Sequence, residues 1–389
     1  MHTPKIGTLA LLLLLGASCQ PPAQKNHAGA SSTTNSTTAK LVDSSSFAAL
    51  IDQKKVSLYT LKNDQGMSVQ LSNFGARIVG LIVPDRNQNP TDVVLGFPKA
   101  EMYNNPEEPF FGTIVGPYGN RIAQGKLTIG NNSYDLVKND GPNTLHGGAK
   151  GVHFAVWDAK QENNSVQFTY LLPDKNEGFP GNIKLTVTYT LLPNNSLRID
   201  YQAISDKETA LNLTNHAYFN LNGEGAGTIE NHTLQLFADH YTPVDSTLIP
   251  TGILESVAGT AFDFRQPKAI GKSIQDNTIQ LQYGKGYDHN FVLNKTQVDG
   301  YNYAARVVAD QTGIVMDIYS KEPGIQFYSG NFMNEKVTLK NGKKDSFRTA
   351  FCLEPQNFPD APNHKNFPNS IYKANQLYSS TSIYHFSVE

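Results

Sequence analysis

Seven short stretches of the sequence place ionisable or amide side chains beside glycine, proline or aromatic residues. In a strand-rich protein, such stretches are typical of the loops and strand ends that carry binding and catalytic groups. Proton transfer and hydrogen bonding to a polar molecule are the chemistry that these residue types can perform. The candidates are Arg121, His146, His216, Asp288, His289, Gln326 and Glu354, with residues 239–245 as a further polar run.

Glu354 is the candidate with the fewest alternative explanations. Its carboxyl group directly follows the apolar run 351–353, so we expect it to be partly desolvated. Desolvation raises the pKa of a carboxyl group and suits it to proton transfer near neutral pH. A single histidine such as His146 or His216 is more often a packed structural residue in a β protein, and Arg121 alone could be an ion-pair partner.

The elements that must position these groups are β-strands. Alternation of apolar and polar residues predicts a hairpin of residues 182–191 and 197–204. The same pattern predicts a second hairpin of residues 313–320 and 325–329, and a third pair of strands within residues 67–83. Helical periodicity is scarce. The sequence therefore predicts an all-β fold, a large antiparallel β-sandwich with few short helices.

Composition and charge exclude several classes of protein. The 32 Lys and Arg residues balance 34 Asp and Glu residues, so no basic field exists to hold a nucleic acid. The two cysteines cannot build a disulfide framework. Cys352 lies within an apolar run, and we expect it to pack in the core.

The N-terminal residues predict export. Lys5 precedes an apolar run at residues 9–15, which is too short to cross a bilayer as a mature helix of ~20 residues. Small residues then lead into Cys19. Residues 1–18 thus resemble a bacterial lipoprotein signal peptide, cleaved before Cys19, whose thiol carries lipid. The alternative is an ordinary signal peptide followed by an incidental cysteine.

The residues after the signal divide into a tether and one domain. Residues 19–46 are rich in Ser, Thr and Asn and contain few large apolar residues, so we expect a disordered tether. Residues 47–389 form the single folded domain of this prediction. We expect the protein in the periplasm, or attached to the outer membrane of a bacterium through lipid alone.

Taken together, the polar stretches resemble the motifs of the galactose mutarotase (aldose 1-epimerase) family, in the family's order. The matching segments are residues 120–121, 145–148, 215–221, 287–289 and 353–354, and the resemblance covers nearly all of residues 47–389. Pro355 stands where the family usually has threonine, which leaves the carboxylate of Glu354 in place. The resemblance implies the family's supersandwich form of the β-sandwich.

The resemblance also implies an isomerase that interconverts the α and β anomers of free hexoses such as galactose and glucose, and so feeds hexose metabolism. Glu354 would be the base that removes the proton of the C1 hydroxyl, and His216 the acid that protonates the ring oxygen. Because that acid must be protonated, we expect a neighbouring carboxylate to hold the pKa of His216 up. The residues that the resemblance assigns to sugar binding are Asn120, Arg121, His146, Ala217, Tyr218, Asp288 and Gln326.

The implied reaction needs no organic cofactor, because it only moves protons and rotates one bond. The motifs contain no dense carboxylate loop, and we predict no metal site; bound calcium is implied only by resemblance to relatives described with it. The partner is a small aldose, and the resemblance implies a monomer.

Three other functions fit parts of the pattern. A lectin-like module would lack the acid or the base, and both are present here. A glycosidase would need two opposed carboxylates, which Asp288 and Glu354 could supply. A hexose-6-phosphate epimerase would need several basic residues, whereas Arg121 stands alone near the motifs. Which aldose is preferred does not follow from these residues.

Overall fold

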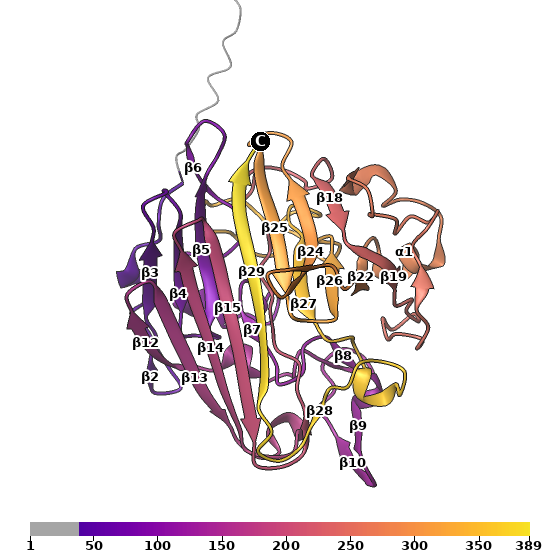
Figure 1. Ribbon diagram of the computed structural model, residues 1–389. Coiled ribbons are helices and arrows are strands. Elements are labelled where there is room, and N and C mark those ends of the chain that lie inside the picture. The colour runs from indigo at the N-terminus through magenta and orange to yellow at the C-terminus, as the bar shows by residue number, and fades with distance from the viewer. Residues whose placement is uncertain (1–38) are drawn as a thin grey trace, which may run out of the picture. The chain divides into compact units, whose positions relative to one another are not determined.

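Alternating apolar residues build the largest sheet of the molecule. In the computed structural model, which describes residues 39–389, strand β14 (Ile183–Leu192) buries every second residue from Ile183 to Leu191. This period of two places one face of the sheet against the core (Figure 1). The sheet has ten strands: β12 (Asp158–Glu162), β13 (Ser165–Leu172), β14, β15 (Ser196–Ser205), β29 (Tyr378–Val388), β25 (Ile314–Ser320), β24 (Tyr301–Val308), β18 (Thr233–Leu236) and β21 (Lys268–Ala269) in order, with β23 (Gln297–Val298) beside β24.

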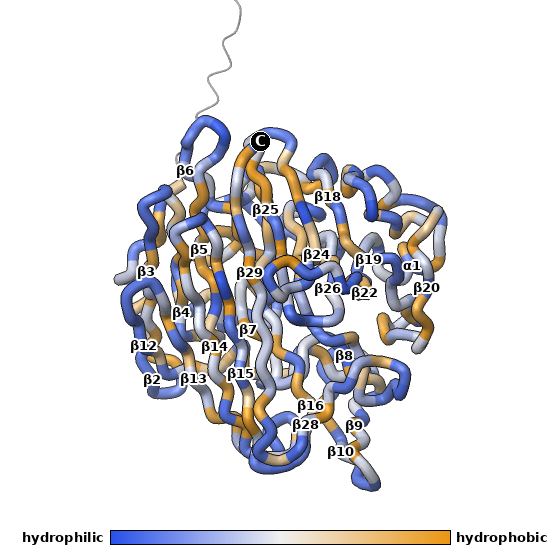
Figure 2. The backbone as a smooth tube through the Cα atoms, viewed as in Figure 1, coloured by the Kyte–Doolittle hydropathy of each residue, from blue (hydrophilic) through white to orange (hydrophobic). Residues whose placement is uncertain are grey.

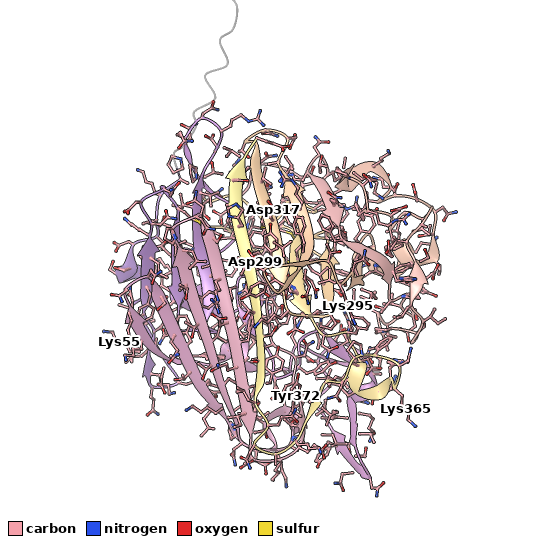
Figure 3. All side chains as sticks on the ribbon, in the orientation of Figure 1. Lys55, Lys295, Asp299, Asp317, Lys365 and Tyr372 are labelled. Carbon is pink, nitrogen blue, oxygen red and sulfur yellow. The ribbon has the colours of Figure 1, made fainter. Side chains whose placement is uncertain are left out.

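Two smaller sheets pack with it around one large hydrophobic cluster. Along the strands, apolar and polar residues alternate in Figure 2, and charged side chains such as Lys55 and Lys365 lie on the outside (Figure 3). The four-stranded sheet contains β3 (Leu58–Lys62), β4 (Ser68–Ser72), β5 (Arg77–Pro84) and β6 (Pro90–Asp92). The five-stranded sheet contains β20 (Glu255–Ser256), β19 (Ala238–Tyr241), β22 (Asp288–Leu293), β26 (Gly324–Tyr328) and β27 (Cys352–Gln356).

Short elements complete residues 39–389. The two-stranded pairs are β1 (Leu50–Ile51) with β2 (Lys54–Lys55), β7 (Ile114–Val115) with β17 (Thr214–Asn215), β8 (Arg121–Ile122) with β11 (Thr144–Leu145), β9 (Lys126–Ile129) with β10 (Asn132–Asp135), and β16 (Thr209–Ala210) with β28 (Ile371–Tyr372). The helical elements are α1 (Ile279–Gly284) and seven 3-10 turns: Ser44–Phe47, Ala100–Tyr103, Ala123–Gly125, Val152–Phe154, Asn176–Gly178, Ile270–Lys272 and Ala361–Asn363. Within this part of the chain, no helix is long and apolar enough to cross a membrane.

The all-β prediction is confirmed, and two of the three predicted strand pairs are present. Strands β14 and β15 form the first hairpin, and β4 pairs with β5. The hairpin predicted from residues 313–320 and 325–329 is wrong, because β25 and β26 belong to different sheets. The chain crosses between the sheets at residues 321–323, where β25 ends and β26 begins.

The segment 39–46, which we assigned to the tether, contacts the four-stranded sheet. The backbone N–H of Val42 donates to Gln70 Oε1 over 2.7 Å, and Gln70 Nε2 donates back to the Val42 carbonyl over 2.8 Å. The N–H of Ala39 donates to the carbonyl of Pro90. The packed domain therefore includes these residues. The predicted signal peptide, Cys19 and the rest of the tether lie outside the described residues.

The five-stranded sheet positions the polar groups that the sequence singled out. Strands β26 and β27 are buried on both faces. Their register pairs Gln326 with Glu354 and Phe327 with Leu353, so alternate residues face opposite ways. One face carries Phe327 and Leu353 into the hydrophobic core. The other carries polar side chains, among them Glu354.

Candidate active site

A cavity of about 810 Å³ lies at the polar face of the five-stranded sheet. Segments between residue 106 and residue 354 form its wall, so residues far apart in the sequence share one pocket. The predicted residues that line it are Asn120, Arg121, His146, His216, Tyr218, Asp288 and Glu354.

The carboxyl group of Glu354 and the ring of His216 lie together in this wall. Glu354 Oε1 is 3.7 Å from His216 Nε2, and the two side chains are 2% and 7% exposed. The other carboxyl oxygen, Oε2, is buried and has no hydrogen-bond partner among the described residues. An acid and a base therefore lie close together, and one carboxyl oxygen has no hydrogen-bond partner in the described part of the chain.

The backbone and two aromatic rings fix the orientation of His216. Its N–H donates to the carbonyl of Thr113 over 2.8 Å, and its carbonyl accepts from the N–H of Gly112 over 3.0 Å. The rings of Phe110 and Tyr218 lie nearly parallel to the imidazole, with centroids 5.6 and 5.1 Å away. This packing leaves the imidazole little freedom to rotate.

The ring nitrogens of the two site histidines have different partners. The backbone N–H of Asn120 donates to His146 Nδ1 over 3.1 Å, so the neutral His146 ring carries its proton on Nε2. By contrast, the two ring nitrogens of His216 face side chains: Nδ1 lies 3.5 Å from Cys352 Sγ, and Nε2 lies 3.7 Å from Glu354 Oε1. His146 therefore acts as a fixed hydrogen-bond donor, whereas His216 Nε2 faces the carboxyl group of Glu354.

Burial controls the protonation of the pair and overturns one expectation. We expected a neighbouring carboxylate to hold the pKa of His216 up, but burial lowers its pKa to about 3. Burial also raises the pKa of Glu354 well above its ordinary value; Asp288 adds to this rise and Arg121 opposes it. The physical reason is that burial removes solvent from both side chains and so disfavours their charged forms. At pH values above the pKa of His216 and below the raised pKa of Glu354, the pair holds one titratable proton.

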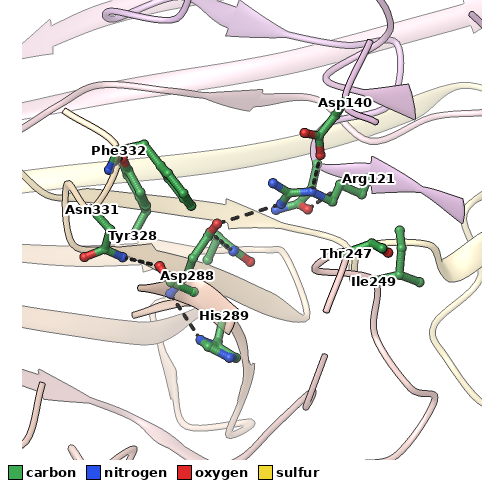
Figure 4. A network of polar contacts seen from close by, with 12 residues as sticks. Arg121, Asp140, Thr247, Ile249, Asp288, His289, Tyr328, Asn331 and Phe332 are labelled. Carbon is green, nitrogen blue, oxygen red and sulfur yellow. Dashed lines mark hydrogen bonds and ion pairs between the residues drawn. The ribbon is translucent and has the colours of Figure 1, made fainter. Parts of the chain in front are cut away.

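Arg121 and Asp288 form the polar network beside the pair (Figure 4). Arg121 Nε donates to Asp140 over 2.7 Å, and Arg121 Nη1 is 3.8 Å from Asp288 Oδ2. Gln326 Nε2 donates to Asp288 Oδ1 over 2.7 Å. Burial raises the pKa of Asp288, while Arg121 and Gln326 pull it down. The network offers guanidinium donors and carboxylate acceptors, the groups that bind vicinal hydroxyls.

The turn that presents His146 explains the glycine that follows it. His146 and Gly147 both have positive φ, at 52° and 83°. A Cβ at residue 147 would overlap the carbonyl oxygen of Gly116. Only glycine fits that position, because it needs both the left-handed backbone and the close approach. The Leu-His-Gly-Gly segment therefore forms a turn that orients the imidazole of His146.

Three predicted positions have other roles in the structure. Ala217 is 1% exposed and packs in the hydrophobic core rather than in the cavity wall. Gln326 lies behind Asp288, which it holds, and does not line the cavity. His289 points to the opposite face of β22, where its nitrogens contact the N–H of Asp288 and Gln280 Oε1. It is a structural histidine.

Sequence reasoning missed one whole side of the cavity. Residues 106–110 supply an acidic and aromatic edge, in which burial raises the pKa of Glu108 to about 8. The signal was a pair of glutamates enclosed by prolines and followed by two phenylalanines. Other lining residues that we did not single out include His153, Phe154, Thr247, Tyr283, Lys285, Tyr328 and Phe332.

The only group of potential metal ligands found among residues 39–389 belongs to the same wall. One ligand atom each of His146, His216 and Glu354 lies within 4.8 Å of the others. The set does not fit calcium, which takes about 6 to 8 oxygen ligands. His146 also directs a protonated nitrogen towards the cavity, because Asn120 occupies the lone pair on Nδ1. The arrangement suits proton transfer better than metal binding.

Comparison with known proteins gives a consistent picture. A family model described as aldose 1-epimerase matches residues 57–385. The galactose mutarotase of Mus musculus is 42% identical over 333 residues, which are 86% of this chain and 94% of that protein. The aldose 1-epimerase of Escherichia coli (strain K12) is 36% identical over 341 residues, 87% of this chain and 97% of that protein.

Two solved structures share the fold. The structure of an aldose epimerase homologue from C. elegans has a TM-score of 0.78 at 32% identity, and covers 86% of this chain and 99% of its own. The galactose 1-epimerase from Lactobacillus acidophilus NCFM has a TM-score of 0.76 at 31% identity, and covers 87% of this chain and 97% of its own.

Proposed function

The chain belongs to the aldose 1-epimerase family and interconverts the α and β anomers of free aldoses, and from this premise we propose that Glu354 and His216 carry the two proton transfers. The observation behind the proposal is the 3.7 Å separation of Glu354 Oε1 and His216 Nε2 in the cavity wall. One base and one acid are what anomer interconversion requires.

The shared proton makes the pair effective in both directions. With Glu354 ionised and His216 protonated, the carboxylate takes the proton of the C1 hydroxyl while Nε2 gives a proton to the ring oxygen. The C1–O bond to the ring breaks, and both side chains become neutral. Burial favours that neutral state, since it raises the pKa of Glu354 and lowers that of His216. The ionised carboxylate is thus a strong base, and the imidazolium a strong acid.

The anomer changes while the chain is open. The C1–C2 bond rotates, the ring hydroxyl attacks the other face of the aldehyde, and the two protons return to their starting groups. Arg121, His146 and Asp288 hold the remaining hydroxyls, with Asn120 and Tyr218 alongside. No electron is gained or lost and no group leaves, so the chemistry itself calls for no organic cofactor.

The network around Asp288 disfavours the glycosidase reading. Arg121 and Gln326 both engage this carboxylate, at 3.8 and 2.7 Å, so it is committed to holding neighbours rather than poised as a nucleophile. The test is polarimetry on freshly dissolved α-D-galactose and α-D-glucose, run beside a nitrophenyl galactoside. We expect faster decay of optical rotation and no release of nitrophenol. Release of nitrophenol without faster mutarotation would refute the assignment.

We further propose galactose as a substrate, supported by the names of the galactose mutarotase relatives. We propose that the protein is exported and lipid-anchored as a monomer. Lys5, the apolar run 9–15 and the small residues before Cys19 support export and the anchor. Family resemblance supports the monomer.

A further inference from the structure

Cys352 lies against the second nitrogen of the His216 ring. Its Sγ is 3.5 Å from Nδ1, while Glu354 Oε1 is 3.7 Å from Nε2. Cys352 and Glu354 are two residues apart on β27, so both side chains leave the same face of that strand. One strand therefore supplies a partner to each nitrogen of one imidazole.

The thiol is neutral in this position. Cys352 is fully buried, in a cluster that includes Tyr218 and Tyr328, and burial raises the pKa of its thiol well above the ordinary value. A neutral, enclosed thiol is neither a nucleophile nor a ready target for oxidation. Its sulfur keeps lone pairs that accept hydrogen bonds weakly. Packing, which the sequence predicted for Cys352, is thus one of two roles open to it.

The carbonyl of His216 is a second acceptor close to its own ring. It already accepts the N–H of Gly112 over 3.0 Å, and because it belongs to the same residue it cannot orient the ring from outside. Sulfur is the partner that comes from a different strand and can set the ring angle independently. In Ser-His-Asp enzymes a carboxylate performs this task at Nδ1, where it holds the tautomer and the orientation of the ring.

We propose that Cys352 is a positioning residue: its Sγ accepts the Nδ1–H of His216 and so keeps Nε2 available for proton exchange with the sugar. The proposal rests on the role of His216 as the acid. The site then contains two imidazoles locked in opposite tautomers, His146 by the Asn120 N–H and His216 by the Cys352 sulfur.

Two substitutions separate positioning from packing. Cys352→Ser keeps a hydrogen-bond acceptor but places a polar hydroxyl in an apolar cluster, whereas Cys352→Val keeps bulk and apolarity but has no acceptor. We expect Cys352→Val to lose about 5-fold in kcat, the worth of one modest hydrogen bond, with KM unchanged. Cys352→Ser should retain most of kcat. If the side chain only packs, the order reverses, and that result would overturn the proposal.

A measurement on the resting protein makes the test independent of turnover. The ¹⁵N shifts of the His216 ring report which nitrogen carries the proton. We expect Nδ1–H in the native protein and in Cys352→Ser, and a growing Nε2–H population in Cys352→Val. An Nε2–H ring in the native protein would refute the proposal. The expected shifts combined with equal kcat in all three proteins would instead count against His216 as the acid.

Discussion

Replacing Glu354 with glutamine tests the mechanism most directly. Glutamine has the same shape, but it cannot take a proton from the C1 hydroxyl. Removing a general base costs about 10²- to 10⁴-fold in rate. The structure favours the upper half of that range, because Asp288, the carboxylate beside the pair, is held by Arg121 and Gln326 and cannot substitute. We therefore expect a fall of about 10³- to 10⁴-fold in kcat, or about 4 to 5.5 kcal/mol of barrier.

The fold should survive this change. Burial raises the pKa of Glu354 and so favours its neutral form, and its Oε2 gives up no hydrogen bond. Glu322→Gln is the matched control, since Glu322 is a second buried glutamate, 6% exposed, that accepts a hydrogen bond from Tyr378 and lies outside the cavity. It should leave kcat unchanged.

The assay is the decay of optical rotation of fresh α-D-galactose, corrected for spontaneous mutarotation. The fold of both glutamine variants is checked by their circular dichroism and melting temperatures. A folded Glu354→Gln protein within about 10-fold of native kcat would remove Glu354 from the mechanism. A comparable loss in Glu322→Gln would show that the effect arises from burial rather than chemistry.

The remaining predictions concern pH, binding and the anchor. The kcat should fall as pH rises through the raised pKa of Glu354, because the pair then loses its single titratable proton. On the acid side, kcat should fall only near pH 3, where the His216 ring becomes doubly protonated. A pH–rate profile centred below pH 3 would contradict this. Arg121→Ala should raise KM about 10- to 100-fold with a smaller effect on kcat, because it removes charged hydrogen bonds to the substrate. Both constants are read from initial rates, and an unchanged KM would place the sugar elsewhere. Cys19→Ser should move the protein from the membrane to the soluble fraction of its native host, and unchanged membrane association would rule out the lipid anchor.

The sequence located the site but not its internal geometry. The resemblance of the ordered motifs to the aldose 1-epimerase family, rather than any single residue, identified His216, Glu354 and Arg121, which the structure brings to one cavity. Period-two alternation says which side chains share a face of a strand, yet not which face meets the core. Asp288 and His289 are neighbours in sequence, and only the register of β22 against β26 shows that one faces the cavity and the other a structural network.

Long-range pairing and electrostatics were the other unpredictable parts. Strands β25 and β26 follow one another closely but join different sheets, because partner choice depends on strands that come from distant parts of the chain. The pKa of His216 was expected to be high on the strength of a neighbouring carboxylate. Burial lowers that pKa instead, and the depth at which a side chain is buried depends on loops such as residues 106–110 that pack over it.

Because β26 and β27 are buried on both faces, the site can unfold only together with the whole domain. Because the strand that carries Glu354 also carries Leu353 into the core, the catalytic face cannot open by local fraying. Amide hydrogens of these strands should exchange with solvent only through global unfolding. Heat or denaturant will then abolish activity at the same midpoint as the fold, with no inactive native-like state in between.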